Sequence, residues 1–244
     1  MSEENPGERI VVVSAHAADF VWRAGGAISL YAGRGHEVHV LCLTFGERGE
    51  SQGLWKHQGM TLEKVKETRR RESAEAAEIL GASISFLDAD DYPLRATESV
   101  YDAVTTTFRT LRPSVILTHP ERDPYNYDHA LTHEVVMRSR MVAQAAGHDP
   151  ATPSLGATQV MAFEPHQPEQ CDFVPNLLLD ISSVFEKKRA AMEVMEGAQG
   201  HLVQYYTELG TRRGVQAVRN GGRTAITQAE AYQRIFPVVG EELI

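Results

Sequence analysis

The chain has 244 residues, the length of one large domain, and its 42% hydrophobic and 23% charged residues are typical of a globular protein with a buried core. No stretch approaches the ~20 consecutive apolar residues of a membrane-spanning helix, so we expect no membrane partner. The net charge of −9 argues against a nucleic-acid partner, because proteins that bind nucleic acids present a basic face.

The first ten residues, MSEENPGERI, are polar and acidic. They do not resemble a secretory signal, so we expect a cytoplasmic protein, and we also expect a homo-oligomer. The two cysteines, Cys42 and Cys171, lie far apart without the spacing of metal ligands. A disulfide is not expected in the cytoplasm, and Cys42 is predicted to be a small buried hydrophobic residue.

The run Ile10–Ser14 (IVVVS) begins a series of short apolar strands that do not alternate with polar residues. Strands buried on both faces of a sheet show this pattern. Between the strands lie segments with helical features, such as the charged, alanine-rich segment Thr61–Leu80 that ends before Gly81. The pattern predicts strands at 10–14, 38–44, 84–87 and 115–118, and helices at 25–33, 61–80, 100–111 and 129–146.

Strands that alternate with helices indicate parallel pairing through right-handed crossovers. We therefore expect an α/β fold with a Rossmann-like, doubly wound, mostly parallel sheet. Beyond residue 150 the pattern is looser, with strands expected at 160–163 and 177–179 and helices at 184–195 and 202–213. Neither a repeat nor a flexible linker divides the sequence. We expect a single domain over residues 1–244, with a core of about 9–150 and a C-terminal elaboration of about 151–244.

In an open α/β sheet, ligands bind beyond the carboxyl ends of the strands. This places the site in the polar loops at 15–23, 45–51, 88–95 and 119–133. His16 and Asp19 stand three residues apart after the first strand, and His129 follows the fourth strand. Together they form a nitrogen and oxygen set that suits catalytic zinc, although residue types alone leave manganese, iron or hydrogen-bonded loop histidines open. Asp128 is a candidate for orienting an imidazole ring.

Three motifs resemble the PIG-L/LmbE family: H-x-x-D after the first strand, T-F-G-E after the second, and D-H at the start of a later helix. This family is known for zinc-dependent deacetylases of the N-acetylglucosamine type. The resemblance covers nearly the whole chain and implies an LmbE-like fold. It also implies that Zn2+ is held by His16, Asp19 and His129. Further matching segments are Asp180, Lys187-Lys188 and Ala229-Glu230-Ala231.

The sequence departs from the deacetylases at two positions. Deacetylases of this family read A-H-P-D-D-E, and the first aspartate is their general base, whereas this chain has Ala18 there. They often place a histidine three residues before the histidine of D-H, whereas this chain has Asn126. An alanine cannot accept a proton, so the deacetylase mechanism lacks its base. Because the metal ligands are retained, we expect different chemistry on the same metal.

Four longer segments resemble the hydratase branch of this family: S-A-H-A-A-D-F-V-W-R-A-G-G, F-G-E-R-G-E-S, D-P-Y-N-Y-D-H and F-E-P-H-Q-P-E-Q. That branch adds water across the C=C of 4-oxalomesaconate in bacterial gallate breakdown and forms 4-carboxy-4-hydroxy-2-oxoadipate. The resemblance therefore implies a hydro-lyase with a small tricarboxylate substrate.

Hydration of a C=C conjugated to carbonyls requires a Lewis acid, a base for water and an acid for carbon. Glu47, after the second strand, is the candidate base because Ala18 cannot accept a proton. The alternative is a supporting carboxylate, since the deacetylases also carry G-E here. His166 stands between two prolines and is the candidate acid, and the alternative is a structural loop histidine.

A substrate with a charge near −3 requires cationic groups, and the planar guanidinium group suits carboxylates. Arginines in the predicted loops, and two neighbouring polar residues, are the candidates for substrate binding: Arg23, Arg48, Arg122, Asn126 and Tyr127. Of the run Arg69–Arg71, at least two residues are expected on a solvated helix face. His133 either supports the site or packs on its helix.

Two other functions remain open from the sequence. A zinc deacetylase that has moved its base to Glu47 would keep the metal and take a neutral N-acetyl substrate. A non-catalytic protein could use the metal to capture polycarboxylates. Dinucleotide binding is not expected, because no G-x-G-x-x-G follows the first strand.

Overall fold

The structure, a computed structural model, describes residues 8–239. Most of the N-terminal segment on which the cytoplasmic expectation depends, residues 1–7, lies outside the described residues. The described residues form a seven-stranded sheet in the order β3-β2-β1-β4-β5-β7-β6. The strands are β1 (Arg9–Ser14), β2 (Glu37–Cys42), β3 (Ser83–Phe86), β4 (Val115–Thr118), β5 (Gln159–Phe163), β6 (Leu177–Asp180) and β7 (Ala229–Arg234).

The first five strands pair in parallel, and β7 runs antiparallel to both of its neighbours, β5 and β6. The expected α/β fold with a mostly parallel sheet is therefore confirmed. The antiparallel strand β7 was not predicted from the sequence. It lies between β5 and β6, so the last described strand of the chain joins the same sheet as the first.

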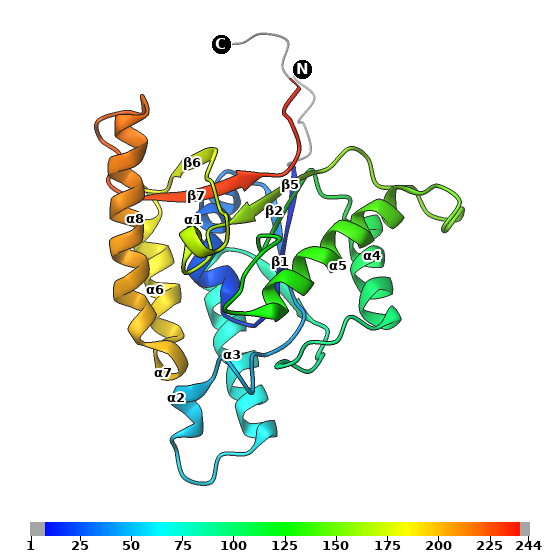
Figure 1. The fold of residues 1–244 in the computed structure, drawn as a ribbon, viewed down its shortest axis with the longest axis horizontal. Helices are drawn as coiled ribbons and strands as arrows, with labels where there is room; N and C mark the ends of the chain where they lie inside the picture. Colours follow the sequence, from blue (N-terminus) through cyan, green and yellow to red (C-terminus); the bar gives the residue numbers. More distant parts are fainter. Residues whose placement is uncertain (1–7, 240–244) are drawn as a thin grey trace.

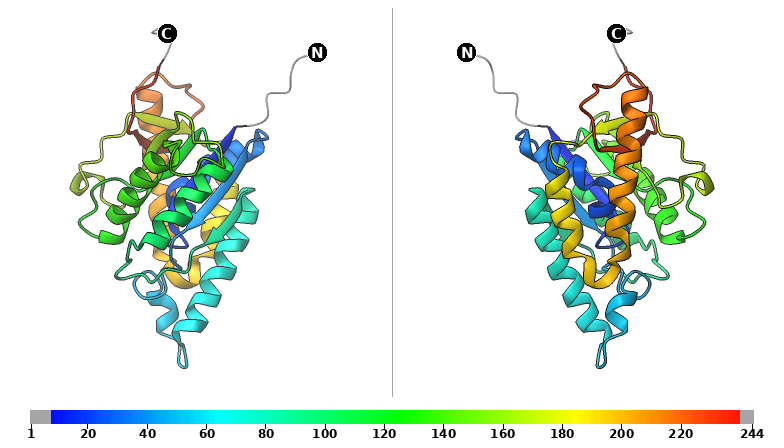
Figure 2. Two further views of the ribbon diagram at one scale, coloured as in Figure 1. Left: turned by 90° about the vertical axis from the view of Figure 1, so that its right-hand side faces the viewer. Right: turned by 90° about the vertical axis from the view of Figure 1, so that its left-hand side faces the viewer.

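Helices cover both faces of the sheet (Figures 1 and 2). One apolar core packs the sheet against α1, α3, α6 and α8, and a second core packs the other face against α4 and α5. Among residues 8–239, no helix is both long and apolar enough to cross a membrane. The helices are α1 (Asp19–Gly33), α2 (Gln52–Trp55), α3 (Leu62–Leu80), α4 (Glu98–Leu111), α5 (Tyr127–Gln144), α6 (Phe185–Val194), α7 (Glu196–Gln199) and α8 (His201–Arg219).

The ends of α3 follow the expected local rules. The hydroxyl of Thr61 accepts a hydrogen bond from the backbone N–H of Lys64, which caps the first turn. At the other end Gly81 adopts φ of 86°, a left-handed conformation that glycine reaches without steric cost. In the basic run, Arg70 and Arg71 are exposed as expected, whereas Arg69 is buried.

Helix α1 begins earlier than the sequence pattern indicated. Residues 19–23, which we expected in an irregular loop, form its first turns and are buried. Consequently Asp19 lies at the first position of a helix directly after the loop that contains His16. The short helices α2 and α7 were also not predicted, because four residues are too few to show a helical period.

The chain order reverses between β1 and β4, which are neighbours in the sheet although far apart in sequence. Such a switch point opens a crevice at the carboxyl ends of the two strands. Ser14 ends β1 and Thr118 ends β4, so His16 and His119 both emerge at this crevice.

Candidate active site

The three predicted metal ligands lie together at the switch point, and all three are buried. The carboxylate of Asp19 stands between the two imidazole rings. One oxygen, Oδ2, lies 3.2 Å from Nδ1 of His16, and the other, Oδ1, lies 3.4 Å from Nε2 of His129. The helix start at Asp19 and the preceding loop therefore bring the H-x-x-D pair to the first residues of α5.

Each of the two histidines has a second carboxylate at its outer nitrogen. Nδ1 of His129 lies 2.8 Å from Asp123, and Nε2 of His16 lies 3.4 Å from Asp128. Asp128 is itself fixed, because it accepts backbone hydrogen bonds from Tyr92 and Leu94. Such outer carboxylates orient an imidazole so that its other nitrogen faces a metal. The predicted position of Asp128 beside an imidazole agrees with this arrangement.

The donor set fits a tetrahedral metal ion such as zinc. Zinc binds imidazole nitrogens and carboxylate oxygens, which are the donor atoms that His16, Asp19 and His129 offer. Among the described residues, potential ligand atoms lie within 4.8 Å of one another in two groups that share His129: His16 with Glu50 and His129, and Asp19 with His119 and His129. Within residues 8–239, Nε2 of His129 is buried without a hydrogen-bond partner. A buried nitrogen of this kind is costly unless a ligand occupies its lone pair.

The electrostatics of the cluster favour a positive charge at its centre. Burial disfavours the charged form of Asp19, yet the electrostatic interactions and hydrogen bonds that it makes with His129 and His119 hold its pKa well below the usual value. Burial alone would lower the pKa of His16, but hydrogen bonds to Asp128 and Asp19 raise it to about 10. Carboxylates thus outweigh the other charges around His16, and either a proton or a metal cation can balance them.

His119 is a further member of the cluster that the sequence analysis missed. Its ring stacks on His129, with centroids 4.1 Å apart and planes 17° apart. Its Nε2 accepts a hydrogen bond from the backbone N–H of Ala15 and lies 3.4 Å from Asp19. Burial and the charge of His129 keep the pKa of His119 well below its usual value, so the ring is neutral. Its position directly after β4 was the available signal.

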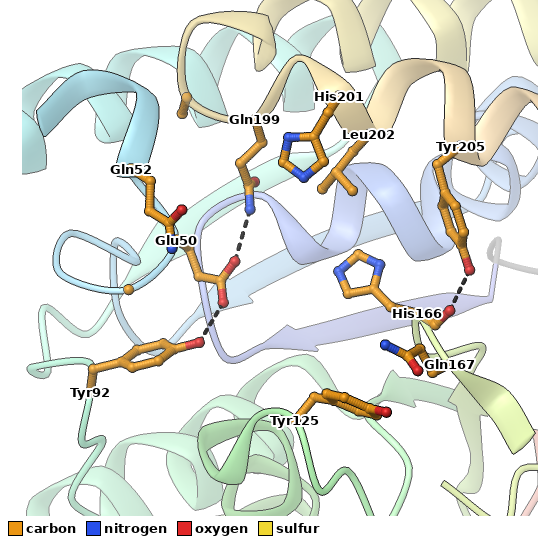
Figure 3. A pocket seen from close by; sticks show the side chains of 12 residues that line it. Glu50, Gln52, Tyr92, Tyr125, His166, Gln167, Gln199, His201, Leu202 and Tyr205 are labelled. Atoms are coloured by element: carbon orange, nitrogen blue, oxygen red, sulfur yellow. Dashed lines mark hydrogen bonds between the residues drawn. The ribbon is translucent and has the colours of Figure 1, made fainter. Parts of the chain in front are cut away.

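A cleft of about 400 Å³ opens beside the cluster, and Glu50 projects into it (Figure 3). Oε1 of Glu50 accepts hydrogen bonds from the Tyr92 hydroxyl at 2.8 Å and from Asn126 Nδ2 at 2.9 Å. Oε2 accepts one from Gln199 Nε2 at 2.8 Å. Potential ligand atoms of Glu50, His16 and His129 all lie within 4.8 Å of one another. The Glu50 carboxylate therefore faces both the metal cluster and the cleft.

Glu47, the predicted base, has different surroundings. Its carboxylate is fully buried, with Oε1 3.2 Å from Arg48 and 3.8 Å from Lys66. Burial raises its pKa above the usual value, and it is not among the residues that line the described cleft. Glu47 and Glu50 belong to the same G-E-R-G-E-S segment, and the sequence analysis considered only Glu47. The catalytic role of Glu47 stays a prediction that these contacts do not favour.

His166 lines the cleft, as its predicted role requires. Its Nδ1 lies 3.1 Å from the Tyr206 hydroxyl, and its backbone carbonyl accepts a hydrogen bond from the Tyr205 hydroxyl. Burial, together with the charge of Arg23, lowers the pKa of His166 to about 3. In the free protein the ring is consequently neutral at neutral pH.

The three predicted substrate arginines do not line the cleft within the described part of the chain. Arg23 is 2% exposed and lies behind the cluster, with Nη2 3.5 Å from Nδ1 of His129. Arg48 pairs with Asp90 at 2.9 Å, and Arg122 is exposed and pairs with Asp172. Their roles in substrate binding stay predictions.

The two other predicted substrate contacts also have unexpected positions. Asn126 donates to Glu50, so it holds a carboxylate of the protein. Tyr127 is 81% exposed and lines a different hollow, beside Leu131. Other side chains line the cleft instead. Tyr92 and Tyr125 belong to the predicted site loops 88–95 and 119–133, whereas nothing in the local sequence marked the remaining residues. These include Gln52, Gln167, Gln199, His201 and Tyr205.

Comparisons with known proteins agree with this geometry. The family model described as GlcNAc-PI de-N-acetylase (PIG-L) matches residues 11–139. The chain is 51% identical over 241 residues to the 4-oxalmesaconate hydratase of Pseudomonas putida, covering 98% of this chain and 93% of that protein. It is 27% identical to the diacetylchitobiose deacetylase of Thermococcus kodakarensis, covering 79% of this chain and 70% of the relative.

A solved structure shows the same likeness. The crystal structure of GalB, the 4-carboxy-2-hydroxymuconate hydratase from Pseudomonas putida KT2440, superposes with a TM-score of 0.94 at 51% identity. The match covers 97% of this chain and 100% of that chain. The N,N'-diacetylchitobiose deacetylase from Pyrococcus horikoshii superposes with a TM-score of 0.77 at 19% identity, covering 95% of this chain and 86% of that chain, which shows a shared fold.

Proposed function

The chain belongs to the PIG-L (GlcNAc-PI de-N-acetylase) family, and from this premise we propose that it is a zinc-dependent hydratase. Its substrate would be 4-oxalomesaconate, and its product 4-carboxy-4-hydroxy-2-oxoadipate. The 51% identity to a hydratase over nearly the whole chain supports the proposal. The observation that carries it is the arrangement of Ala18 and Glu50. Position 18 offers no base, while Glu50 supplies a carboxylate to the same cluster from another loop.

His16, Asp19 and His129 would hold the metal, and the cluster of buried nitrogen and carboxylate donors fits zinc. Bound there, zinc would supply Lewis acidity, which stabilises negative charge on a substrate oxygen and acidifies water. Asp123 and Asp128 would fix the orientation of the two rings through their outer nitrogens.

Addition of water requires removal of one proton from the attacking oxygen. Glu50 is the carboxylate best placed to accept it, because its side chain reaches both the cleft and the cluster. Three neutral donors hold its two oxygens, which leaves remaining lone pairs free to accept a proton. Glu47 remains the second candidate. Its contacts with Arg48 and Lys66 suit a supporting role in the loop.

The second proton must reach a carbon atom of the former double bond, and His166 is the proposed donor. The ring is neutral in the free protein because it is buried beside Arg23. A bound tricarboxylate places negative charge in the same cleft, which favours the protonated ring. Proton uptake by His166 would therefore accompany substrate binding. Removal of one proton by Glu50 and donation of another by His166 together balance the addition of one water molecule.

The substrate's negative charge requires a cationic group near the cleft. Arg23 is buried behind the cluster, and within the described residues its Nε and Nη1 have no hydrogen-bond partner. We propose that its charge acts on the substrate across the cluster. The cytoplasmic location and the homo-oligomeric state expected from the sequence also stay predictions.

The test is to mix the purified protein with 4-oxalomesaconate and to follow the loss of its conjugated ultraviolet absorbance, with and without a chelator. We expect a fast, chelator-sensitive loss that yields the hydroxylated tricarboxylate. No loss by metal-loaded protein would overturn the proposal. Release of acetate from an N-acetylglucosamine substrate would instead support the deacetylase alternative. Metal-dependent binding of the tricarboxylate without turnover would support a binding protein.

A further inference from the structure

Glu50 is held by a residue that lies 149 positions later in the chain. This residue is Gln199, the last residue of the short helix α7. The amide Nε2 of Gln199 donates to Oε2 of Glu50 at 2.8 Å, and Figure 3 shows this contact across the cleft from Tyr92. The other two donors, Tyr92 and Asn126, both act on Oε1. Gln199 is therefore the described side chain that restrains the second oxygen of Glu50.

The orientation of the Gln199 amide is set by Trp22. Nε1 of Trp22 donates to Oε1 of Gln199 at 3.1 Å, and an indole N–H can act only as a donor. The amide oxygen must consequently face Trp22, so its NH2 group faces Glu50. A flipped amide would place two oxygens against each other and leave the indole N–H buried without an acceptor. Gln199 is 8% exposed, so solvent offers little alternative.

Both ends of this contact are held by close packing. The Trp22 ring stacks on Tyr206 of α8, with centroids 5.7 Å apart. On the other side α7 touches α2 so closely that a Cβ on Gly53 would lie 2.3 Å from the carbonyl oxygen of Gly197. Glycine is required at that position because any side chain would collide with the backbone of α7. The position of Gln199 is thus fixed by α1, α2 and α8 together.

We propose that Gln199, oriented by Trp22, is a positioning residue that holds the Glu50 carboxylate in its catalytic orientation toward the metal cluster. This inference rests on the proposed function of Glu50 as the base. A carboxylate held on one oxygen alone can turn about its last bond, because that torsion is broad and has no sharp minima. The donor on Oε2 removes this freedom. Gln199 would therefore act on the rate of the chemical step, with little direct effect on substrate binding.

The test compares three variants of the metal-loaded enzyme: Gln199→Leu, Trp22→Phe and the double variant. Gln199→Leu should lower kcat by about 10- to 100-fold with a much smaller change in KM, as is usual for residues that support a catalytic group. Trp22→Phe keeps an aromatic ring against Tyr206 and removes the N–H, so it should lower kcat less. Gln204→Leu on α8 breaks an exposed contact with Glu208 and is the matched control, with kcat unchanged.

The double variant separates positioning from folding. Gln199→Leu alone leaves the buried indole N–H of Trp22 without an acceptor. The double variant removes the indole N–H together with the amide, so it should recover thermal stability. If Gln199 positions Glu50, kcat stays low in the double variant although the melting temperature rises. If Gln199 is merely structural, kcat recovers together with stability, and the proposal is overturned.

The same substitution of Gln199, made in the Glu50→Gln enzyme, shows whether Gln199 acts through Glu50. In the Glu50→Gln enzyme the replacement of Gln199 by leucine should cause no further fall in kcat, because the group that it positions is already lost. An additional fall of the same size as in wild type would overturn the proposal. Zinc content, measured in every variant, should stay at the wild-type level. Absence of turnover by the wild-type enzyme would overturn the proposed function itself, whereas an active wild type with a fully active Gln199→Leu variant overturns this inference alone.

Discussion

The carboxylate of Asp123 lies 2.8 Å from Nδ1 of His129, while Nε2 of the same ring faces Asp19. Burial opposes ionisation of Asp123, but its hydrogen bond with His129 and the charge of that ring lower its pKa to about 2. The pair fixes which nitrogen of His129 is free to bind a metal, because the proton stays on the side of the carboxylate.

Replacement of Asp123 by asparagine should therefore weaken zinc binding. We expect a loss of affinity of about 10- to 100-fold, the usual effect of removing a carboxylate behind a ligating histidine. Competition with a chromophoric chelator measures this affinity without reference to activity. Asp172→Asn provides a matched control, because Asp172 pairs with Arg122 at an exposed position. Equal zinc affinities of wild type and Asp123→Asn would show that the Asp123 contact does not support the metal.

The two carboxylates of the loop after β2 can be separated by parallel substitutions. Glu50→Gln should lower kcat by about 10²- to 10⁴-fold with zinc retained, because it removes the proton acceptor that faces the cleft. Glu47→Gln should leave kcat much closer to wild type, since Glu47 contacts Arg48 and Lys66 away from the cleft. Steady-state kinetics and zinc analysis of both variants make the comparison. The reverse order of effects would restore Glu47 as the base.

The sequence could predict that the candidate metal ligands lie close together, because they follow strand ends, where local patterns are informative. His16, Asp19 and His129 follow β1 and β4, and the parallel sheet brings these ends together. The surroundings of Glu50 could not be predicted in the same way. They depend on α7, a four-residue helix, and on its contact with α2 at Gly53. The hydrogen bond between Glu50 and Gln199 joins residues 149 positions apart, and such a contact leaves no periodic pattern in the sequence.

The ion pairs of the candidate arginines show a similar limit of sequence analysis. Composition indicates how many cations a chain has, but their ion pairs are decided by tertiary packing. Arg48 forms an ion pair with Asp90, and Arg122 forms one with Asp172. Asp90 and Asp172 lie in polar loops, and nothing in the sequence indicates that these loops pair with the arginines.

His166 should make the metal-free protein less stable in acid. Its pKa is about 3 in the folded protein against 6.5 as the usual value. Between these values the unfolded chain binds a proton that the folded protein does not, so stability rises with pH across this window. His166→Asn should reduce that slope by about 1.4 kcal/mol per pH unit, the effect of one proton. Urea titrations of both metal-free proteins from pH ~6.5 downward measure it, and identical slopes would contradict the buried, neutral ring.

Glu230 of β7 should be essential for stability, because it joins α1 and α6 to the sheet. Its two oxygens accept hydrogen bonds from the backbone N–H groups of Gly26 and Ala27, at 2.7 and 2.8 Å. The same carboxylate receives Lys188 Nζ at 2.7 Å, and both charged side chains are at most 5% exposed. Glu230→Ala leaves the buried ammonium group unpaired and should lower the free energy of unfolding by about 3–5 kcal/mol.

Denaturant unfolding measures this loss, and the exposed pair Arg189–Glu193 on the same helix as Lys188 supplies the control. Arg189→Ala should change the free energy of unfolding by less than about 1 kcal/mol, since solvent screens that pair. The double change Glu230→Gln with Lys188→Met removes both charges and should cost less than Glu230→Ala, because no buried charge is left without a partner. A loss in Glu230→Ala as small as in Arg189→Ala would show that the buried pair does not hold β7 against α1.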